Sequence, residues 1–186
     1  PSPPQSRNRA GSPEGRAVDD SQRLRYSRHL LLDGFGEDSQ ERLLASRALV
    51  VGAGGLGSGA LPYLASSGVG RITIADGDVV DLTNLQRQVV HRVDAIGTNK
   101  ALSAAATLAA LNPEISVQIL PERLAPERLQ ALVRDADVVL DCSDNFATRH
   151  AIKRACVHHG QPLVSGAAIR FDGQVRVYDL RRDDST

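Results

Sequence analysis

Short apolar runs alternate with longer segments of helical character along most of the chain. The predicted strands cover residues 48–51, 71–75, 115–120, 136–140, 162–168 and 174–180. The predicted helices between them cover residues 56–67, 98–111, 126–134 and 146–159. Strands that alternate with helices of roughly a dozen residues are typical of a parallel sheet. The pattern therefore predicts an α/β fold: a doubly wound, mostly parallel, Rossmann-like sheet with helices on both faces.

The amino-terminal part of the chain has a different composition. Residues 1–20 are rich in Pro, Ser, Gly and Arg, and they cannot bury much apolar surface. They predict a disordered tail. A first helix is expected after it, capped by Ser21 or Asp20, followed by a short second helix over 39–45. Residues 21–186 are expected to form one domain.

Composition narrows the class of protein. Of the 186 residues, 41% are hydrophobic and only 3% aromatic, which suits helices packed on a parallel sheet. The net charge is zero, so no global field favours nucleic acid or an acidic membrane as a partner. No apolar run has the length of a membrane span. The two cysteines form no CxxC pair, and we expect a cytoplasmic protein.

A glycine-rich segment lies between the first predicted strand and the following helix. Gly52, Gly54 and Gly57 match G-x-G-x-x-G, in which the glycines permit a tight turn, phosphate approach and close helix packing. The helix amino terminus adds free N–H groups and the positive end of a dipole. Asp76, at the end of the second predicted strand, can accept hydrogen bonds from a ribose. This pattern predicts a bound nucleotide without choosing between NAD, FAD, SAM and ATP.

Polar residues beyond Asp76 favour a triphosphate. The segment carries Asp78, Asp81, Asn84, Gln86, Arg87, Gln88 and His91, and Lys100 follows. Arginine can bind phosphate oxygens in pairs and lysine supplies a point charge. The alternative is a solvated loop without a ligand. A second acidic segment ends a later strand, where Asp144 could hold Mg²⁺ or could simply cap a helix.

Six short motifs occur in the order found in one family. They are RYSR at 25–28, GAGGLG at 52–57, DGD at 76–78, NLQRQ at 84–88 with Lys100 after it, DCSDN at 141–145 and PLVSGA at 162–167. Over about residues 24–180 the chain resembles the ThiF/MoeB/HesA family, the prokaryotic relatives of the ubiquitin-activating enzymes.

The resemblance implies an adenylyltransferase that uses ATP and Mg²⁺. Its partner would be a small ubiquitin-like sulfur-carrier protein ending in Gly-Gly, such as the small subunit of molybdopterin synthase or a thiamine sulfur carrier. The carrier's terminal carboxylate would attack the α-phosphate, giving an acyl-adenylate and pyrophosphate. Two anions must meet in this reaction, so catalysis consists mainly of positioning and charge stabilisation.

The same resemblance implies roles for individual residues. Gly54 and Gly55 would line the phosphate turn, and Asp76 would bind the ribose. The phosphates would be held by Asn84, Arg87, Gln88 and Lys100, of which Arg87 and Lys100 would be catalytic. Asp144 would hold Mg²⁺ and act in catalysis. Arg28 would reach the γ-phosphate from the other subunit of a homodimer; its alternative is an exposed helix charge.

The family usually continues with two CxxC pairs that bind a structural Zn²⁺, and those ligands are absent from this chain. Cys142, Cys156, His158 and His159 are too scattered to replace them. We expect a truncated chain or an adenylating half without the zinc module. The alternatives are a related acceptor (another sulfur carrier, a siderophore or cysteine-pathway carrier, or a tRNA base), a NAD-dependent oxidoreductase, and a non-catalytic nucleotide-binding fragment.

Overall fold

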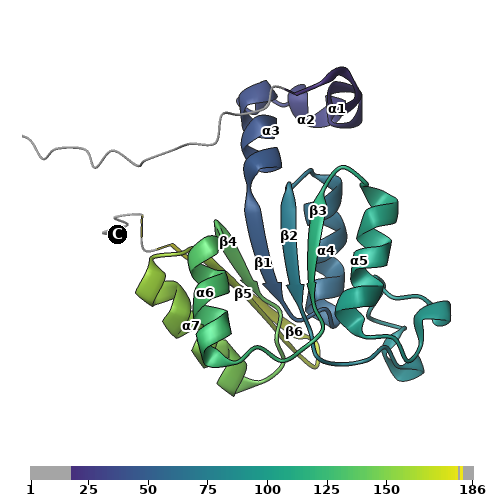
Figure 1. Ribbon diagram of the computed structural model, residues 1–186, viewed down its shortest axis with the longest axis vertical. Coiled ribbons are helices and arrows are strands. Elements are labelled where there is room, and N and C mark those ends of the chain that lie inside the picture. Colours follow the sequence, from purple (N-terminus) through teal and green to yellow (C-terminus); the bar gives the residue numbers. More distant parts are fainter. Residues whose placement is uncertain (1–17, 180, 182–186) are drawn as a thin grey trace, which may run out of the picture.

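The core of the protein is a six-stranded sheet in the order β3-β2-β1-β4-β5-β6 (Figure 1). The computed structural model describes residues 18–179 and 181. The strands are β1 (Arg47–Val51), β2 (Arg71–Ala75), β3 (Ser116–Leu120), β4 (Val138–Asp141), β5 (Leu163–Ile169) and β6 (Asp172–Tyr178). Neighbouring strands from β3 to β5 are parallel, and β6 pairs with β5 in antiparallel register. The predicted doubly wound, mostly parallel sheet is confirmed.

Helices cover both faces of the sheet. The helices are α4 (Gly55–Ser66), α5 (Lys100–Leu111), α6 (Pro126–Asp135) and α7 (Phe146–His159). One apolar cluster joins α4 and α5 to the sheet through side chains such as Leu61 and Leu108, which are fully buried. A second cluster joins α6 and α7 to the other face through Val133 and Ile152. Burial of these apolar side chains is the main favourable term in stability.

Three further helices precede the sheet: α1 (Asp20–Arg25), α2 (Ser27–Leu30) and α3 (Gly36–Ala45). The predicted caps were wrong. Asp19 caps α1, because its carboxylate accepts from the Gln22 N–H while the Gln22 side chain accepts from the Asp19 N–H. The first 17 residues of the predicted tail lie outside the described residues, and Val18 is buried.

The amino-terminal helices lie beyond the end of the sheet where the strands begin (Figure 1). Helix α3 leads almost directly into β1. Two buried side chains fasten this layer to α4. Gln40 donates to the Ser67 carbonyl, and Asn112 donates to both the Tyr26 hydroxyl and the Ala65 carbonyl. The glycine-rich segment after β1 lies at the opposite end of the sheet, where the strands finish.

The β5–β6 hairpin leaves one face of the sheet open. Tyr178 packs with the α6–α7 cluster, so Val175 and Val177 project to the other face, where they are 74% and 69% exposed. That face is shared with α4, since a side chain at Gly166 would meet Leu56 at 3.4 Å. Among the described residues, no helix is both long and apolar enough to cross a membrane.

Candidate functional site

The glycine turn follows β1 at the carboxyl edge of the sheet. Gly52 has a φ of 101°, and a β-carbon there would lie 2.6 Å from the Cys142 carbonyl oxygen. A β-carbon on Gly57 would lie 2.1 Å from the Gly52 carbonyl oxygen. The packing of the chain itself therefore requires these two glycines, without reference to any ligand.

Gly54 and Gly55 are different, because the fold leaves room at both. A β-carbon on Gly54 would meet only the Gln88 amide nitrogen, at 3.7 Å, and one on Gly55 would meet nothing within 4 Å. Within the described part of the chain, the N–H groups of Gly54, Gly55 and Leu56 have no hydrogen-bond partner. Unpaired N–H groups at the start of a helix form an anion-binding site.

Asp76 connects the end of β2 to the glycine turn. One carboxylate oxygen accepts from the Ala53 N–H at 2.7 Å, and the other accepts from the Asp78 N–H at 2.8 Å. Each oxygen retains a further lone pair, so these two bonds are compatible with the predicted ribose contact. Sequence reasoning did not identify the contact with Ala53, which requires the parallel pairing of β1 with β2.

A cation lies beside the turn at the start of α5. Lys100 is the first residue of this helix and only 7% exposed, and its ammonium nitrogen lies 3.7 Å from an Asp78 carboxylate oxygen. Arg123, in the loop after β3, reaches the same carboxylate at 3.2 Å. Sequence reasoning missed Arg123, because the loop that carries it lies 45 residues from Asp78 in the chain.

The segment between β2 and α5 contains the other predicted phosphate ligands. It forms two short 3₁₀ turns, η1 (Leu82–Asn84) and η2 (Val93–Ala95). Arg87 is exposed and its guanidinium donates to the Thr83 carbonyl at 3.4 Å, whereas Asn84 is half-buried. Gln88 is buried beside Gly54, and its amide oxygen has no partner among the described residues. The unpartnered atom is an acceptor, so a phosphate would be met instead by the amide nitrogen, which lies on the side of Gly54.

His91 has a structural partner on each ring nitrogen. Nε2 lies 2.8 Å from the Ala53 carbonyl oxygen, and Nδ1 lies 3.0 Å from the Ser103 hydroxyl. Burial lowers the pKa of His91 below its ordinary value of 6.5. Grouping His91 with the exposed phosphate-binding residues was an incomplete interpretation of the sequence, because the ring is buried against the back of the turn.

The acidic segment after β4 lies next to the glycine turn, because β4 pairs with β1. Asp141 is buried and accepts from the Ser143 N–H, the Ser143 hydroxyl and the Ser165 hydroxyl. Asn145 caps α7 by accepting from the Thr148 N–H, as predicted. Asp144 remains exposed at the tip, where its carboxylate is the kind of oxygen ligand that Mg²⁺ prefers. In the described part of the chain, no three His, Cys, Asp or Glu residues gather as a metal site.

The two cysteines are packing residues. Burial is the main cause that raises the pKa of Cys142 to about 12 and that of Cys156 to about 11. Thiols with such values are protonated at neutral pH and are weak nucleophiles. Neither of them is suited to covalent catalysis in this fold.

Arg28 is the one predicted site residue that the fold does not bring to the carboxyl edge. It is exposed on α2, at the end of the sheet where the strands begin. The five residues of β1 separate the two ends by about 16 Å. Arg28 therefore does not reach the glycine turn of its own chain in this structure.

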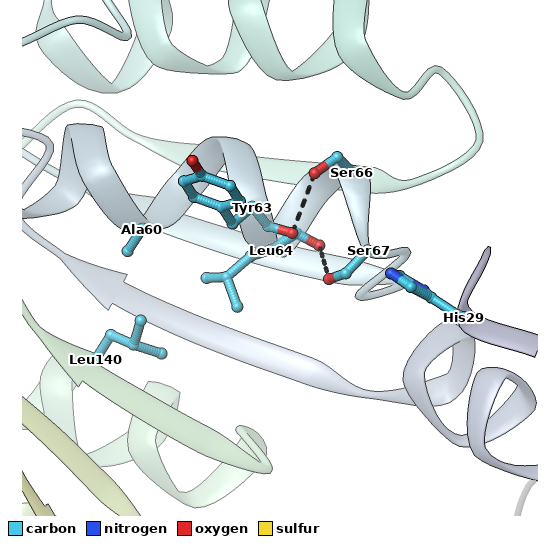
Figure 2. Close-up of a pocket in the computed structure, with 7 residues that line it drawn as sticks. All are labelled: His29, Ala60, Tyr63, Leu64, Ser66, Ser67 and Leu140. Atoms are coloured by element: carbon cyan, nitrogen blue, oxygen red, sulfur yellow. Dashed lines mark hydrogen bonds between the residues drawn. The ribbon is translucent and has the colours of Figure 1, made fainter. Parts of the chain in front are cut away.

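An open pocket of about 610 Å³ lies between α4 and β4 and extends towards α2, away from the glycine turn. Figure 2 shows Tyr63 and Leu64 of α4 on one side of it, Leu140 of β4 opposite, and His29 of α2 at its end. The pocket adjoins the sheet face that carries Val175 and Val177. We call Tyr63, Leu140, Val175 and Val177 the open apolar face.

The doubly wound sheet, the open glycine turn and the acidic residue after β2 define a Rossmann-like nucleotide-binding protein. The ThiF family model matches residues 26–186, and the chain belongs to the ThiF family. The resemblance seen in the sequence motifs is thus confirmed.

Curated relatives and solved structures share this domain. The chain is 49% identical over 158 residues to the SAMP-activating enzyme E1 of Haloferax volcanii, covering 85% of this chain and 58% of the relative. It is 46% identical over 161 residues to the molybdopterin-synthase adenylyltransferase of Escherichia coli strain K12, covering 87% of this chain and 65% of the relative. It therefore spans less than two thirds of either relative's length.

Among solved structures, the chain resembles the E. coli tRNA N6-threonylcarbamoyladenosine dehydratase TcdA in complex with ATP. The TM-score is 0.75 and the identity is 30%, and the match covers 82% of this chain and 64% of that one. The family's relatives thus include a protein with bound ATP and proteins named adenylyltransferases.

Proposed function

We propose that the chain adenylates the C-terminal glycine carboxylate of a small ubiquitin-like sulfur-carrier protein with ATP. The observation that carries the proposal is the glycine turn, whose Gly54 and Gly55 leave space and unpaired N–H groups that the fold itself does not use. The adenylyltransferase names of relatives at 46–50% identity support the choice of reaction.

The residues at the carboxyl edge suit an attack by one anion on another. The carrier's carboxylate oxygen forms a bond to the α-phosphorus of ATP, and the bond from that phosphorus to the bridging oxygen breaks to release pyrophosphate. Lys100 and Arg87 place positive charge beside the phosphates, and Gln88 offers its amide. Asp144 would hold Mg²⁺, which would neutralise phosphate charge when bound. The enzyme needs no nucleophile of its own, in keeping with its protonated thiols.

A homodimer would complete this site. Arg28 is exposed at the far end of the sheet, so only a second copy could bring an equivalent arginine to the glycine turn. The open apolar face gives a second copy a surface to bury, since Val175 and Val177 are exposed beside the pocket along α4. We expect Val177→Asp to yield a monomer by light scattering, while Val157→Asp, at an apolar position on α7 that is 55% exposed against 69% for Val177, leaves the mass unchanged.

The carrier we favour is the small subunit of molybdopterin synthase or a thiamine sulfur carrier. The molybdopterin-synthase adenylyltransferases at 45–46% identity support this class of substrate. The structural similarity to a tRNA dehydratase keeps a tRNA base as the second candidate.

Pyrophosphate exchange tests the reaction. Labelled pyrophosphate should enter ATP only when the chain, Mg²⁺ and a carrier ending in Gly-Gly are all present. The matched control is the same carrier without its last glycine, which should support no exchange because the attacking carboxylate is displaced. If no exchange occurs with the intact carrier, and NAD but not ATP raises the melting temperature, the chain would instead be an oxidoreductase. At 100 times its dissociation constant, a ligand adds about 2.7 kcal/mol of stability, which a melting experiment detects readily.

A further inference from the structure

His91 is buried behind the glycine turn and links it to α5. His91 is 6% exposed, and its ring contacts the Ala53 carbonyl through Nε2 and the Ser103 hydroxyl through Nδ1. Because a carbonyl can only accept, Nε2 carries the hydrogen and donates it to Ala53. Burial disfavours the charged ring and lowers the pKa of His91, so the ring is neutral and Nδ1 accepts from the Ser103 hydroxyl.

Ala53 is held through both of its flanking peptide groups, the Gly52–Ala53 peptide and the Ala53–Gly54 peptide. Its N–H donates to the Asp76 carboxylate at 2.7 Å, and its carbonyl accepts from His91 at 2.8 Å. In a planar trans peptide, the carbonyl of one residue and the N–H of the next point in opposite directions. The described residues contain no cis peptide, so the Gly54 N–H is directed away from His91. Within the same residues it has no partner.

The orientation of this peptide decides the sign of the charge that the turn presents. A peptide that precedes glycine meets little steric resistance to rotation, because Gly54 has no β-carbon and has space around it. If the Ala53 carbonyl turned towards the ligand side, it would place an oxygen where an anion is expected to bind. The hydrogen bond from His91 holds that oxygen at the back of the turn.

We propose that His91 is a positioning residue that fixes the Ala53–Gly54 peptide so that the Gly54 N–H donates to a phosphate of the bound nucleotide. His91 does not touch the ligand. Ser103 lies one helical turn after Lys100 in α5, so the same ring also sets the position of the turn relative to the lysine. The inference rests on the proposed function for the identity of the nucleotide as ATP.

The test compares three variants of the full chain by calorimetric titration with ATP–Mg²⁺ and with adenosine. His91→Phe keeps a planar aromatic ring, one atom larger, and removes both hydrogen bonds, whereas His91→Gln retains a donor for the Ala53 carbonyl. Thr107→Val is the matched control, because it removes the 2.7 Å hydrogen bond from Thr107 to the Val90 carbonyl, in the same segment but away from the turn. Unfolding in urea gives the stability of each variant.

In His91→Phe, we expect the dissociation constant for ATP to rise about tenfold, equivalent to about 1.4 kcal/mol, while that for adenosine is unchanged. His91→Gln should stay within about threefold of the wild type, since its amide replaces the lost donor. Thr107→Val should bind ATP normally despite a loss of stability. If His91→Phe does not fold, Ser103→Ala takes its place, because it removes the hydrogen bond to Nδ1 of the ring. This variant should weaken ATP binding about threefold while leaving adenosine binding unchanged.

Two results would overturn the inference. One is unchanged ATP affinity in His91→Phe, or in Ser103→Ala where that variant is used. The other is an equal loss for ATP and adenosine, which would mean that the ring supports the whole pocket and not the phosphate contact. Wild-type chain that binds ATP but shows no carrier-dependent pyrophosphate exchange would contradict the proposed function alone, because these variants measure phosphate binding and not the reaction.

Discussion

Gly54→Ala separates a ligand's requirement for glycine from the fold's own requirement. The added methyl would meet only the Gln88 amide nitrogen, at an ordinary van der Waals distance of 3.7 Å, and the φ of Gly54 is −78°. An alanine restricts the unfolded chain, which stabilises by about 0.4–1 kcal/mol, but the ψ of −148° lies outside the β region and opposes that gain, so we expect the free energy of unfolding to change by less than about 1 kcal/mol. By contrast, a methyl at Gly57 would lie 2.1 Å from the Gly52 carbonyl oxygen, and Gly57→Ala should destabilise strongly.

The effect of Gly54→Ala on ATP binding should be larger than its effect on stability. A phosphate oxygen bound to the Gly54 N–H would lie about 2.7–3.2 Å from the nitrogen, close to where the new methyl projects. We expect the dissociation constant for ATP to rise at least tenfold, or about 1.4 kcal/mol. Urea unfolding and calorimetric titration measure the two effects separately. A stable Gly54→Ala protein that binds ATP as tightly as the wild type would refute the assignment of this turn to phosphate binding.

Three further predictions follow from the same geometry. Arg28→Ala and Asp144→Asn should each abolish pyrophosphate exchange. Mixing the two proteins should restore about a quarter of the wild-type activity, because half of the dimers are mixed and each mixed dimer has one intact site of two. If the subunits exchange but no activity returns, the site is not shared between subunits. The contribution of His91 to stability should fall as the pH drops below about 6.5, because between that pH and the lowered pKa of the folded state the unfolded chain binds more protons; below the lowered pKa it should level off. The fall should be smaller in His91→Phe, and equal pH profiles would argue against a buried neutral ring. Asp141→Ala should cost roughly 3 kcal/mol in urea unfolding, since it leaves the Ser143 and Ser165 hydroxyls without their acceptor, and a change within about 0.5 kcal/mol would contradict this role.

The main discrepancies between prediction and structure concern places where distant segments meet. The strand limits differed from prediction by only a few residues, because short runs of apolar, β-branched residues strongly favour a buried strand. The cap of α1 was misplaced by one or two residues, since Asp19, Asp20 and Ser21 are all good capping residues and only the reciprocal bond with Gln22 distinguishes Asp19. Gln88 and His91 looked equivalent as polar residues of one segment, yet only Gln88 borders Gly54 on its open side.

By itself, the sequence determined the order of strands and helices, the position of the glycine turn and the family, because apolar period, turn glycines and ordered motifs are local properties. The tertiary structure decided which of the turn's glycines serve the fold and which leave space, since that depends on where the Cys142 and Gly52 carbonyls lie. It also placed Arg28 at the opposite end of the sheet from Lys100, through the entry of α3 into β1. These residues lie tens of positions apart in the chain. Whether they meet or stay apart depends on how the strands pair, which no local pattern in the sequence records.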